Sequence, residues 1–335
     1  MTEAMSAMTR RRLLAASLAA GAFGAQWALA DESTSAAPAL ATMIRHPLLV
    51  ASLYRHKVSD AYASDGAAGV NRDSYRYIEE QRQGAEWIVR GLAEGDAGWV
   101  ALGWRILDWG VARQQPDGGF GSGDAFHSTS FFVEALSRAC ILDPTGANEA
   151  RLSCLRRGAA WLTSPSVEPR GAASNAPYTH RRFILAAALG QAAELTSDAT
   201  LARRAAAWAR EGLALQTGDG TDPERGGFDA GYQMVGVLFA LRYLCGCADA
   251  ALRASLREGV RRATKRELTR LAPDGSIDAT GSTRIEIEKS RAGKVKDVPY
   301  GEFMQALVFG AQALPEPAWL EPAERIGRAR GWFRA

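Results

Sequence analysis

Two kinds of predicted helix alternate along this chain of 335 residues, and the alternation limits the folds that it can adopt. Segments such as 131–142 and 234–244 are apolar on nearly every side, so each of them must be buried on every side. The segments that follow them, such as 150–162 and 250–271, carry one apolar stripe with arginines elsewhere, which is typical of a helix with one face in water. The alternation predicts an inner layer of buried helices and an outer layer of amphipathic ones.

The connections between these helices alternate in length as well. The turn from a buried helix to its outer partner is short, whereas the return to the next buried helix is long and polar, at 114–127, 163–178, 216–230 and 272–300. Glycine turns recur in the returns. Gly118 and Gly226 lie 108 residues apart, which we interpret as two repeats of about 54 residues.

We therefore predict an all-α fold, an α/α toroid of five to six helical hairpins, in which 38–62 supplies a first outer helix. An open solenoid of helix pairs is the alternative, and it fits less well because its concave helices would lie in water. In a toroid the long connections all lie at the N-terminal end of the inner helices, which we call the mouth. Helix N-termini bring unpaired N–H groups and partial positive charge there, so the mouth suits an anionic ligand. Polar and apolar residues alternate over 283–288, which predicts a small β-hairpin standing on the mouth.

The first 30 residues have the pattern of an export signal. Three arginines precede a stretch of small apolar residues, and Ala28-Leu29-Ala30 before Asp31 is an A-x-A cleavage site. The paired arginines resemble a twin-arginine signal, so we predict a periplasmic or secreted protein in which 31–335 form a single catalytic domain. A membrane anchor is the alternative, but the 18 residues between Arg12 and Asp31 fall short of the ~20 that a span needs. We expect no membrane association after the signal is removed.

Charge and cysteine content narrow the possible partners. Removing 1–30 takes away three arginines and Glu3, so the formal charge falls from +3 to +1 and gives no reason to expect nucleic-acid binding. A disulfide between Cys140 and Cys154 is possible in an oxidising compartment and stays open. Cys245-Gly-Cys247 lacks further ligands at zinc spacing, so no metal site is predicted.

The long connections carry the residue types that cleave a polysaccharide by β-elimination. This reaction needs a group that neutralises the uronate carboxylate, a base that removes the neighbouring proton, and an acid that protonates the leaving oxygen. We predict His127 or His180 as the base, Tyr178 or Tyr232 as the acid, and Asn175 with Arg284 as the carboxylate clamp. The predicted catalytic residues are His127, Tyr178, His180, Asp229, Tyr232 and Glu302. The predicted substrate-binding residues are Asp124, Asn175, Arg181, Arg284 and Tyr300.

Two other functions remain open at this point. Asp124, Asp229 and Glu302 could face one another across the mouth, and a glycoside hydrolase needs two carboxyl groups ~5 Å or ~6.5–9.5 Å apart. A non-catalytic protein that binds or assembles an exopolysaccharide could use the same mouth as a groove. No dinucleotide, phosphate-loop, zinc-protease or serine-hydrolase motif occurs, so we predict no cofactor.

The motif Q-P-D-G-G-F-G at 115–121 resembles the Q-x-D-G-G-[FW]-G turns of α/α-toroid proteins, which include terpene cyclases, protein prenyltransferases and polysaccharide-cleaving enzymes. The chain lacks the D-x-D-D motif that terpene cyclases of this shape need, and export argues against prenyl chemistry. The chain is thus most similar to α/α-toroid polysaccharide lyases and glycosidases, with the alginate-lyase type nearest by size. This resemblance implies a polysaccharide or oligosaccharide substrate. The candidate lyase residues that it implies are Asn175, Tyr178, His180 and either Arg181 or Arg284.

Overall fold

The computed structural model describes residues 39–41, 44–53, 66–68, 75–290 and 293–332. The predicted export signal at 1–30 lies outside these residues. Within the described ranges, no helix has both the length and the apolar character that crossing a bilayer requires.

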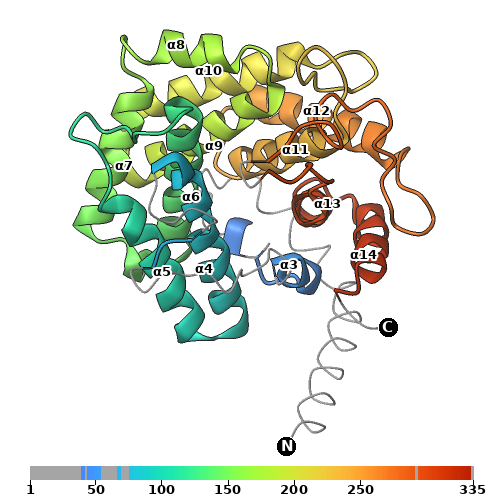
Figure 1. Cartoon of the computed structure of the whole chain (residues 1–335), viewed down its shortest axis with the longest axis horizontal. Helices are drawn as coiled ribbons and strands as arrows, with labels where there is room; N and C mark the ends of the chain where they lie inside the picture. Colours follow the sequence, from blue (N-terminus) through green and yellow to red (C-terminus); the bar gives the residue numbers. More distant parts are fainter. Residues whose placement is uncertain (1–38, 42–43, 54–65, 69–74, 291–292, 333–335) are drawn as a thin grey trace, which may run out of the picture.

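The helices form two concentric rings, which confirms the predicted all-α toroid (Figure 1). Around the inner ring, each helix packs against the next one and the last packs against the first. The inner helices are α3 (Pro47–Leu53), α4 (Gln83–Glu94), α6 (Ala125–Leu142), α9 (Thr179–Thr196), α11 (Ala230–Leu244) and α13 (Tyr300–Ala313). The outer helices are α5 (Ala97–Val111), α7 (Glu149–Leu162), α10 (Ala199–Leu215), α12 (Ala250–Leu268) and α14 (Leu320–Ala329). Shorter elements are η2 (Tyr75–Arg82), η3 (Pro144–Gly146), α8 (Glu168–Asn175) and η4 (Pro317–Trp319).

The placement of the first helix differs from the prediction. We expected an outer helix within 38–62, but α3 lies in the inner ring between α13 and α4 (Figure 1). Leu49 and Leu53 are buried there and join the main hydrophobic core. Because α3 closes the inner ring, it belongs to the buried layer, which the sequence pattern predicted only for helices later in the chain.

The outer helices begin at side-chain caps, which explains why the inner-to-outer connections are short. Asp96, Asn148, Asp198 and Asp249 each precede an outer helix, and each side chain accepts a hydrogen bond from a backbone N–H of the first turn. Such a cap satisfies a donor that would otherwise have no partner. A single polar residue therefore starts each of these four helices directly after a turn.

One glycine turn recurs in three of the returns, at 115–119, 217–221 and 272–276. In each turn the first N–H donates to the fifth carbonyl, and the fourth N–H donates to the first carbonyl. An aspartate at the third position accepts from the fifth N–H. The fourth residue is a glycine with positive φ: Gly118 (+98°), Gly220 (+88°) and Gly275 (+83°). The repeat therefore relates Gly118 to Gly220 and not, as we had interpreted it, to Gly226.

These glycines are needed because each turn rests on the backbone of the next outer helix. A Cβ on Gly118 would lie 2.4 Å from the carbonyl oxygen of Arg157 in α7, and one on Gly220 would lie 2.6 Å from that of Arg262 in α12. Gly226 also has a positive φ, but a Cβ there would meet nothing within 4 Å. The turn thus holds the connection before α6 against α7, and the connection before α11 against α12.

The Gly118→Ala variant is expected to lower the free energy of unfolding by about 2–4 kcal/mol, since it combines an unfavourable φ with a backbone clash. Gly226→Ala has the positive φ without the clash and should cost about 1–2 kcal/mol. Gly123→Ala, at a glycine with ordinary φ and open space, should change stability by less than about 0.5 kcal/mol. Urea unfolding of the three variants checks this order. Equal effects would show that the close contact with α7 does not matter.

The predicted β-hairpin is reduced to a short pairing. Lys289 and Val295 form one antiparallel bridge, and Ser290 N–H donates to the carbonyl of Lys294. Residues 283–288 form turns, because the N–H groups of Ile287 and Glu288 both donate to the carbonyl of Arg284. The loop still stands over the mouth, but a turn rather than a strand directs its side chains.

The possible disulfide is not formed. Cys140 and Cys154 are buried free thiols, and burial raises the pKa of each to about 12. Both side chains therefore act as small apolar groups in the core between α6 and α7.

Candidate active site

Side chains from several long connections meet at the N-terminal ends of α6, α9 and α11. Direct hydrogen bonds, ion pairs or ring contacts join all of them. We call this group the mouth cluster. Its members are Asp124, His127, Asn175, Tyr178, His180, Arg181, Glu224, Arg225, Tyr232, Arg284, Glu288 and Lys296.

His180 and Glu224 form a buried acid–base pair at the centre of the mouth cluster. His180 Nδ1 lies 2.7 Å from Glu224 Oε1, and the same oxygen accepts the backbone N–H of His180 at 3.0 Å. Thr179 holds the two segments together, because its N–H and its hydroxyl both donate to the carbonyl of Pro223. The sequence pattern had identified His180 but not its partner 44 residues away.

The pKa values of this pair favour a neutral imidazole. Burial raises the pKa of Glu224 to about 7. Burial, together with the positive charges of Arg284 and Arg181, lowers the pKa of His180 well below its usual value. Above pH 7 an ionised Glu224 can accept a hydrogen bond from Nδ1–H of His180. The ring proton then lies on Nδ1, and Nε2 is the unprotonated ring nitrogen. Such an imidazole can act as a general base.

Two tyrosines flank His180, and each hydroxyl has its own cation. Tyr178 Oη accepts from Arg225 Nε and Nη2 at 3.2 and 3.1 Å, and Tyr232 Oη accepts from Lys296 Nζ at 3.0 Å. The guanidinium of Arg284 lies 3.6 Å from the ring centre of Tyr232 and 4.9 Å from that of Tyr178. Each tyrosine hydroxyl therefore lies within hydrogen-bond distance of a cation, beside the ring of His180.

Arg181 connects the remaining predicted residues to the mouth cluster. Its guanidinium donates to Asp124 at 2.8 Å and to the side chain of Asn175 at 3.2 Å, and it lies 4.2 Å from the ring centre of Tyr178. Asn175 is buried and holds Arg181, whereas we had paired it with Arg284 as a clamp. His127 lies with its ring 6.1 Å from that of His180, and burial lowers its pKa well below the usual value.

Three predicted residues have other surroundings. Asp229 is fully buried, and its two oxygens accept four backbone N–H groups, two from the start of α11 and two from Arg284 and Ile285. It therefore anchors the loop that carries Arg284. Tyr300 accepts the N–H of Ile277 and stacks under Arg330, toward α14. The charge of Glu302 acts on Arg242, deeper in the ring.

Four residues of the mouth cluster were not among the predicted site residues: Glu224, Arg225, Glu288 and Lys296. Glu224 is the one glutamate in 216–230 and directly precedes Arg225 and a double glycine, which is a weak signal. Arg225 has a φ of +52°, unusual for a residue with a side chain, and this turn directs its guanidinium to Tyr178. Backbone outliers of this kind concentrate at functional sites.

An aromatic layer separates the mouth cluster from the interior of the inner ring, which we call the lumen. His127 contacts Phe131 one turn further along α6, with ring centres 4.7 Å apart. Phe131 in turn contacts Phe239 of α11 at 5.5 Å. The next turns of both helices carry charged side chains into the lumen.

These charges form a buried network across the lumen. Arg138 donates to Glu134 at 3.0 Å and to Glu86 at 3.1 Å. Arg242 lies 3.4 Å from Glu134 and 3.5 Å from Glu86, and it also donates to Gln305. Side chains from α4, α6, α11 and α13 thus meet at one point.

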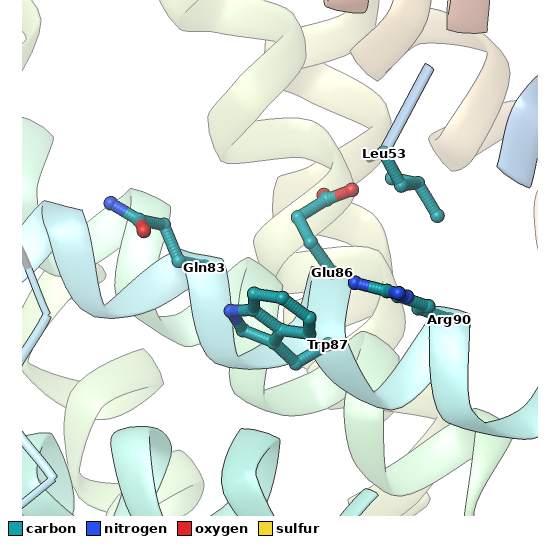
Figure 2. Close-up of a pocket in the computed structure, with 5 residues that line it drawn as sticks. All are labelled: Leu53, Gln83, Glu86, Trp87 and Arg90. Atoms are coloured by element: carbon teal, nitrogen blue, oxygen red, sulfur yellow. The ribbon is translucent and has the colours of Figure 1, made fainter. Parts of the chain in front are cut away.

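A small cavity of about 10 Å³ adjoins this network. Figure 2 shows Gln83, Glu86, Trp87 and Arg90 projecting from α4 around it, with Leu53 of α3 opposite. The volume is enough for about one water molecule, so the cavity is no substrate site. Among the described residues, no group of three or more His, Cys, Asp or Glu side chains is arranged to hold a metal ion.

Comparison with known proteins shows a fold but no family. No protein-family model matches the sequence, and no curated protein sequence matches it. The structure is similar to the unsaturated glucuronyl hydrolase of Bacillus sp. GL1, described as responsible for the degradation of glycosaminoglycan, with a TM-score of 0.60 and 15% identity over 85% of this chain and 82% of that one. It is also similar to a solved polysaccharide lyase, with a TM-score of 0.51 and 14% identity over 90% of this chain and 100% of that one. At such identities the similarity establishes the α/α-toroid fold of this chain.

Proposed function

We propose that this protein is a carbohydrate-active enzyme that cleaves a uronate-containing polysaccharide at the mouth, by β-elimination. The observation that carries the proposal is the concentration of Arg225, Arg284 and Lys296 around a neutral histidine and two tyrosines. A cationic site next to proton-transfer groups suits a substrate that bears a carboxylate beside its reacting carbon. The similarity in fold to a glucuronyl hydrolase and a polysaccharide lyase supports the same class of substrate.

The proposed reaction uses each group once. The cations neutralise the uronate carboxylate, which makes the proton on the adjacent carbon more acidic. His180 removes that proton, the electron pair forms a carbon–carbon double bond, and the bond to the leaving oxygen breaks. The hydroxyl of Tyr178 or Tyr232 gives that oxygen a proton. Glu224 stabilises the protonated His180 through Nδ1.

Hydrolysis is the second candidate, because the solved structure with the higher TM-score of the two is a hydrolase. Its carboxyl pair would be drawn from Asp124, Asp229 and Glu302. Asp124 pairs with Arg181 and is partly exposed, whereas Asp229 is committed to four N–H groups. A binding protein without catalysis remains the third candidate.

A digest of acidic and neutral polysaccharides tests the three functions together. Elimination produces both new reducing ends and an unsaturated sugar that absorbs in the ultraviolet. Hydrolysis produces reducing ends without that absorbance, and a binding protein produces neither. New reducing ends without ultraviolet absorbance, on any uronate polymer, would overturn the lyase proposal.

We also propose that residues 1–30 direct export by the twin-arginine route to the periplasm or beyond, which the sequence pattern supports. Changing Arg11 and Arg12 together to lysine should leave the protein in the cytoplasm. Fractionation and N-terminal sequencing of the exported protein check both the route and cleavage before Asp31.

The elimination rate should rise as the pH rises through about 7, because the raised pKa of Glu224 is about 7. Only ionised Glu224 favours the tautomer of His180 that carries its proton on Nδ1 and leaves Nε2 free to act as the base. Glu224→Gln should lower kcat/KM by about 10²-fold and remove this dependence. The pH profile of kcat/KM for both proteins is the measurement. Glu258→Gln, on the exposed face of α12, is the matched control and should keep the normal profile. A Glu224→Gln enzyme with an unchanged profile would contradict the assignment.

A further inference from the structure

One carboxylate in the mouth cluster is held by three cations at once. Glu288 lies 2.8 Å from Arg225 Nη1, 3.1 Å from Arg284 Nε and 2.6 Å from Lys296 Nζ. These cations come from two different connections, 216–230 and 272–300. Burial opposes ionisation of Glu288, but the bond from Lys296 and the charge of Arg284 hold its pKa below the usual value. Glu288 is therefore a carboxylate ion in a cationic cradle formed by Arg225, Arg284 and Lys296.

The cradle has binding capacity that Glu288 does not use. Arg284 is 7% exposed, yet its Nη1 has no hydrogen-bond acceptor. Glu224 Oε2 lies 3.5 Å from it and is itself without a hydrogen bond. A buried guanidinium nitrogen without an acceptor is costly, so it marks a position where a ligand oxygen would bind favourably.

The cradle also lies beside the groups that transfer protons. Arg225 and Lys296 bond the hydroxyls of Tyr178 and Tyr232, and Arg284 stacks against both rings. A carboxylate in the cradle would thus sit next to the predicted acids, where β-elimination requires the uronate carboxylate to be.

We propose that the cradle of Arg225, Arg284 and Lys296 is the binding site for the carboxylate of a hexuronate unit, and that Glu288 holds this place until substrate displaces it. The inference rests on the proposed function and specifies its substrate subsite. Exchange of one carboxylate for another keeps the charges balanced, so an acidic sugar can enter at small electrostatic cost. A neutral sugar cannot replace Glu288, so the exchange selects for uronates.

Glu288 is placed to leave the cradle. Its side chain is 17% exposed, and it lies on the loop over the mouth rather than on a helix. Two residues before it, Glu286 has a φ of +63°, a conformation that L-residues with side chains rarely adopt. This turn keeps the backbone of Glu288 bonded to the backbones of Arg284 and Lys296, so a rotation of the Glu288 side chain alone would take its carboxylate out of the cradle.

The test compares Glu288→Gln with Glu286→Gln, an exposed neighbour on the same loop. Calorimetric titration with glucuronate should show at least about tenfold tighter binding to Glu288→Gln than to the wild type, because the internal competitor is gone. Glu286→Gln should bind as the wild type does, and methyl glucoside should gain nothing in any of the three. Equal or weaker glucuronate binding by a folded Glu288→Gln protein would overturn the proposal.

A second variant keeps the test decisive if Glu288→Gln does not fold. Arg225 is 51% exposed, so Arg225→Ala should fold normally while glucuronate binding falls about tenfold. Unchanged binding in that variant would overturn the proposal. Oligouronates and free glucuronate are titrated side by side, since both present the same carboxylate. Glucuronate binding without any cleavage would support the cradle proposal and overturn the proposed enzymatic function. Cleavage that neither substitution affects would overturn only the cradle proposal.

Discussion

Alanine in place of His180 is expected to lower kcat/KM on a uronate-containing polysaccharide by about 10²–10⁴-fold, the range for loss of a general base. The reason is geometric, since His180 contacts Glu224 on one side and the two tyrosine rings on the other. Initial rates of ultraviolet absorbance measure the effect. The folded fraction is followed in parallel by circular dichroism, because the imidazole is buried.

The tyrosines supply the matched control for this result. Tyr178→Phe removes a hydroxyl bonded to Arg225, whereas Tyr300→Phe removes a hydroxyl bonded to a backbone N–H near α14. We expect the first change to lower kcat/KM by about 10²-fold or more and the second to leave it within about twofold. If activity survives both Tyr178→Phe and His180→Ala, elimination at this site is wrong.

The second large effect is on stability. Arg138→Met should lower the free energy of unfolding by about 3–5 kcal/mol, because it removes the cation that bonds the buried carboxylate of Glu134 at 3.0 Å and that of Glu86 at 3.1 Å. The side chain of Arg138 is 4% exposed, so water cannot replace the lost bonds. Urea unfolding monitored by circular dichroism gives the value.

An exposed ion pair provides the comparison. Arg156 and Glu149 on α7 form an ion pair with side chains 47% and 79% exposed, and Arg156→Met should cost less than about 1 kcal/mol. The two substitutions change the same residue type in the same way, so the difference isolates burial. Similar small costs for both would mean that the lumen network contributes little to holding the ring together.

The inner and outer layers of the fold could be predicted from the sequence because burial determines the spacing of apolar residues along each helix. A helix such as α9, buried on almost every side, must be apolar on almost every side, and this is visible in 183–189. The spacing of apolar residues did not predict the position of α3. It is a short helix, and its contacts with α13, far away in the sequence, place it in the inner ring.

The grouping of side chains at the mouth could be predicted where it depends on position in the repeat. His127, Tyr178 and His180 stand at the starts of inner helices, and the structure brings them together. Glu224, Arg225 and Glu288 were not predictable, since their roles follow from pairings across the mouth and from a positive φ at Arg225. Asp229 was predicted as a catalytic residue but caps α11. An aspartate that begins a helix has the same sequence pattern whether it caps the helix or takes part in catalysis.

The position of α3 has a consequence for how the molecule is made. A ring that closes by packing α3 against α13 joins the first and the last of the inner helices described here. The hairpins between them can form as they emerge from the ribosome, but α3 gains its contact with α13 only after α13 has been synthesised. A chain shortened before α13 would therefore leave α3 without the neighbour that closes the ring.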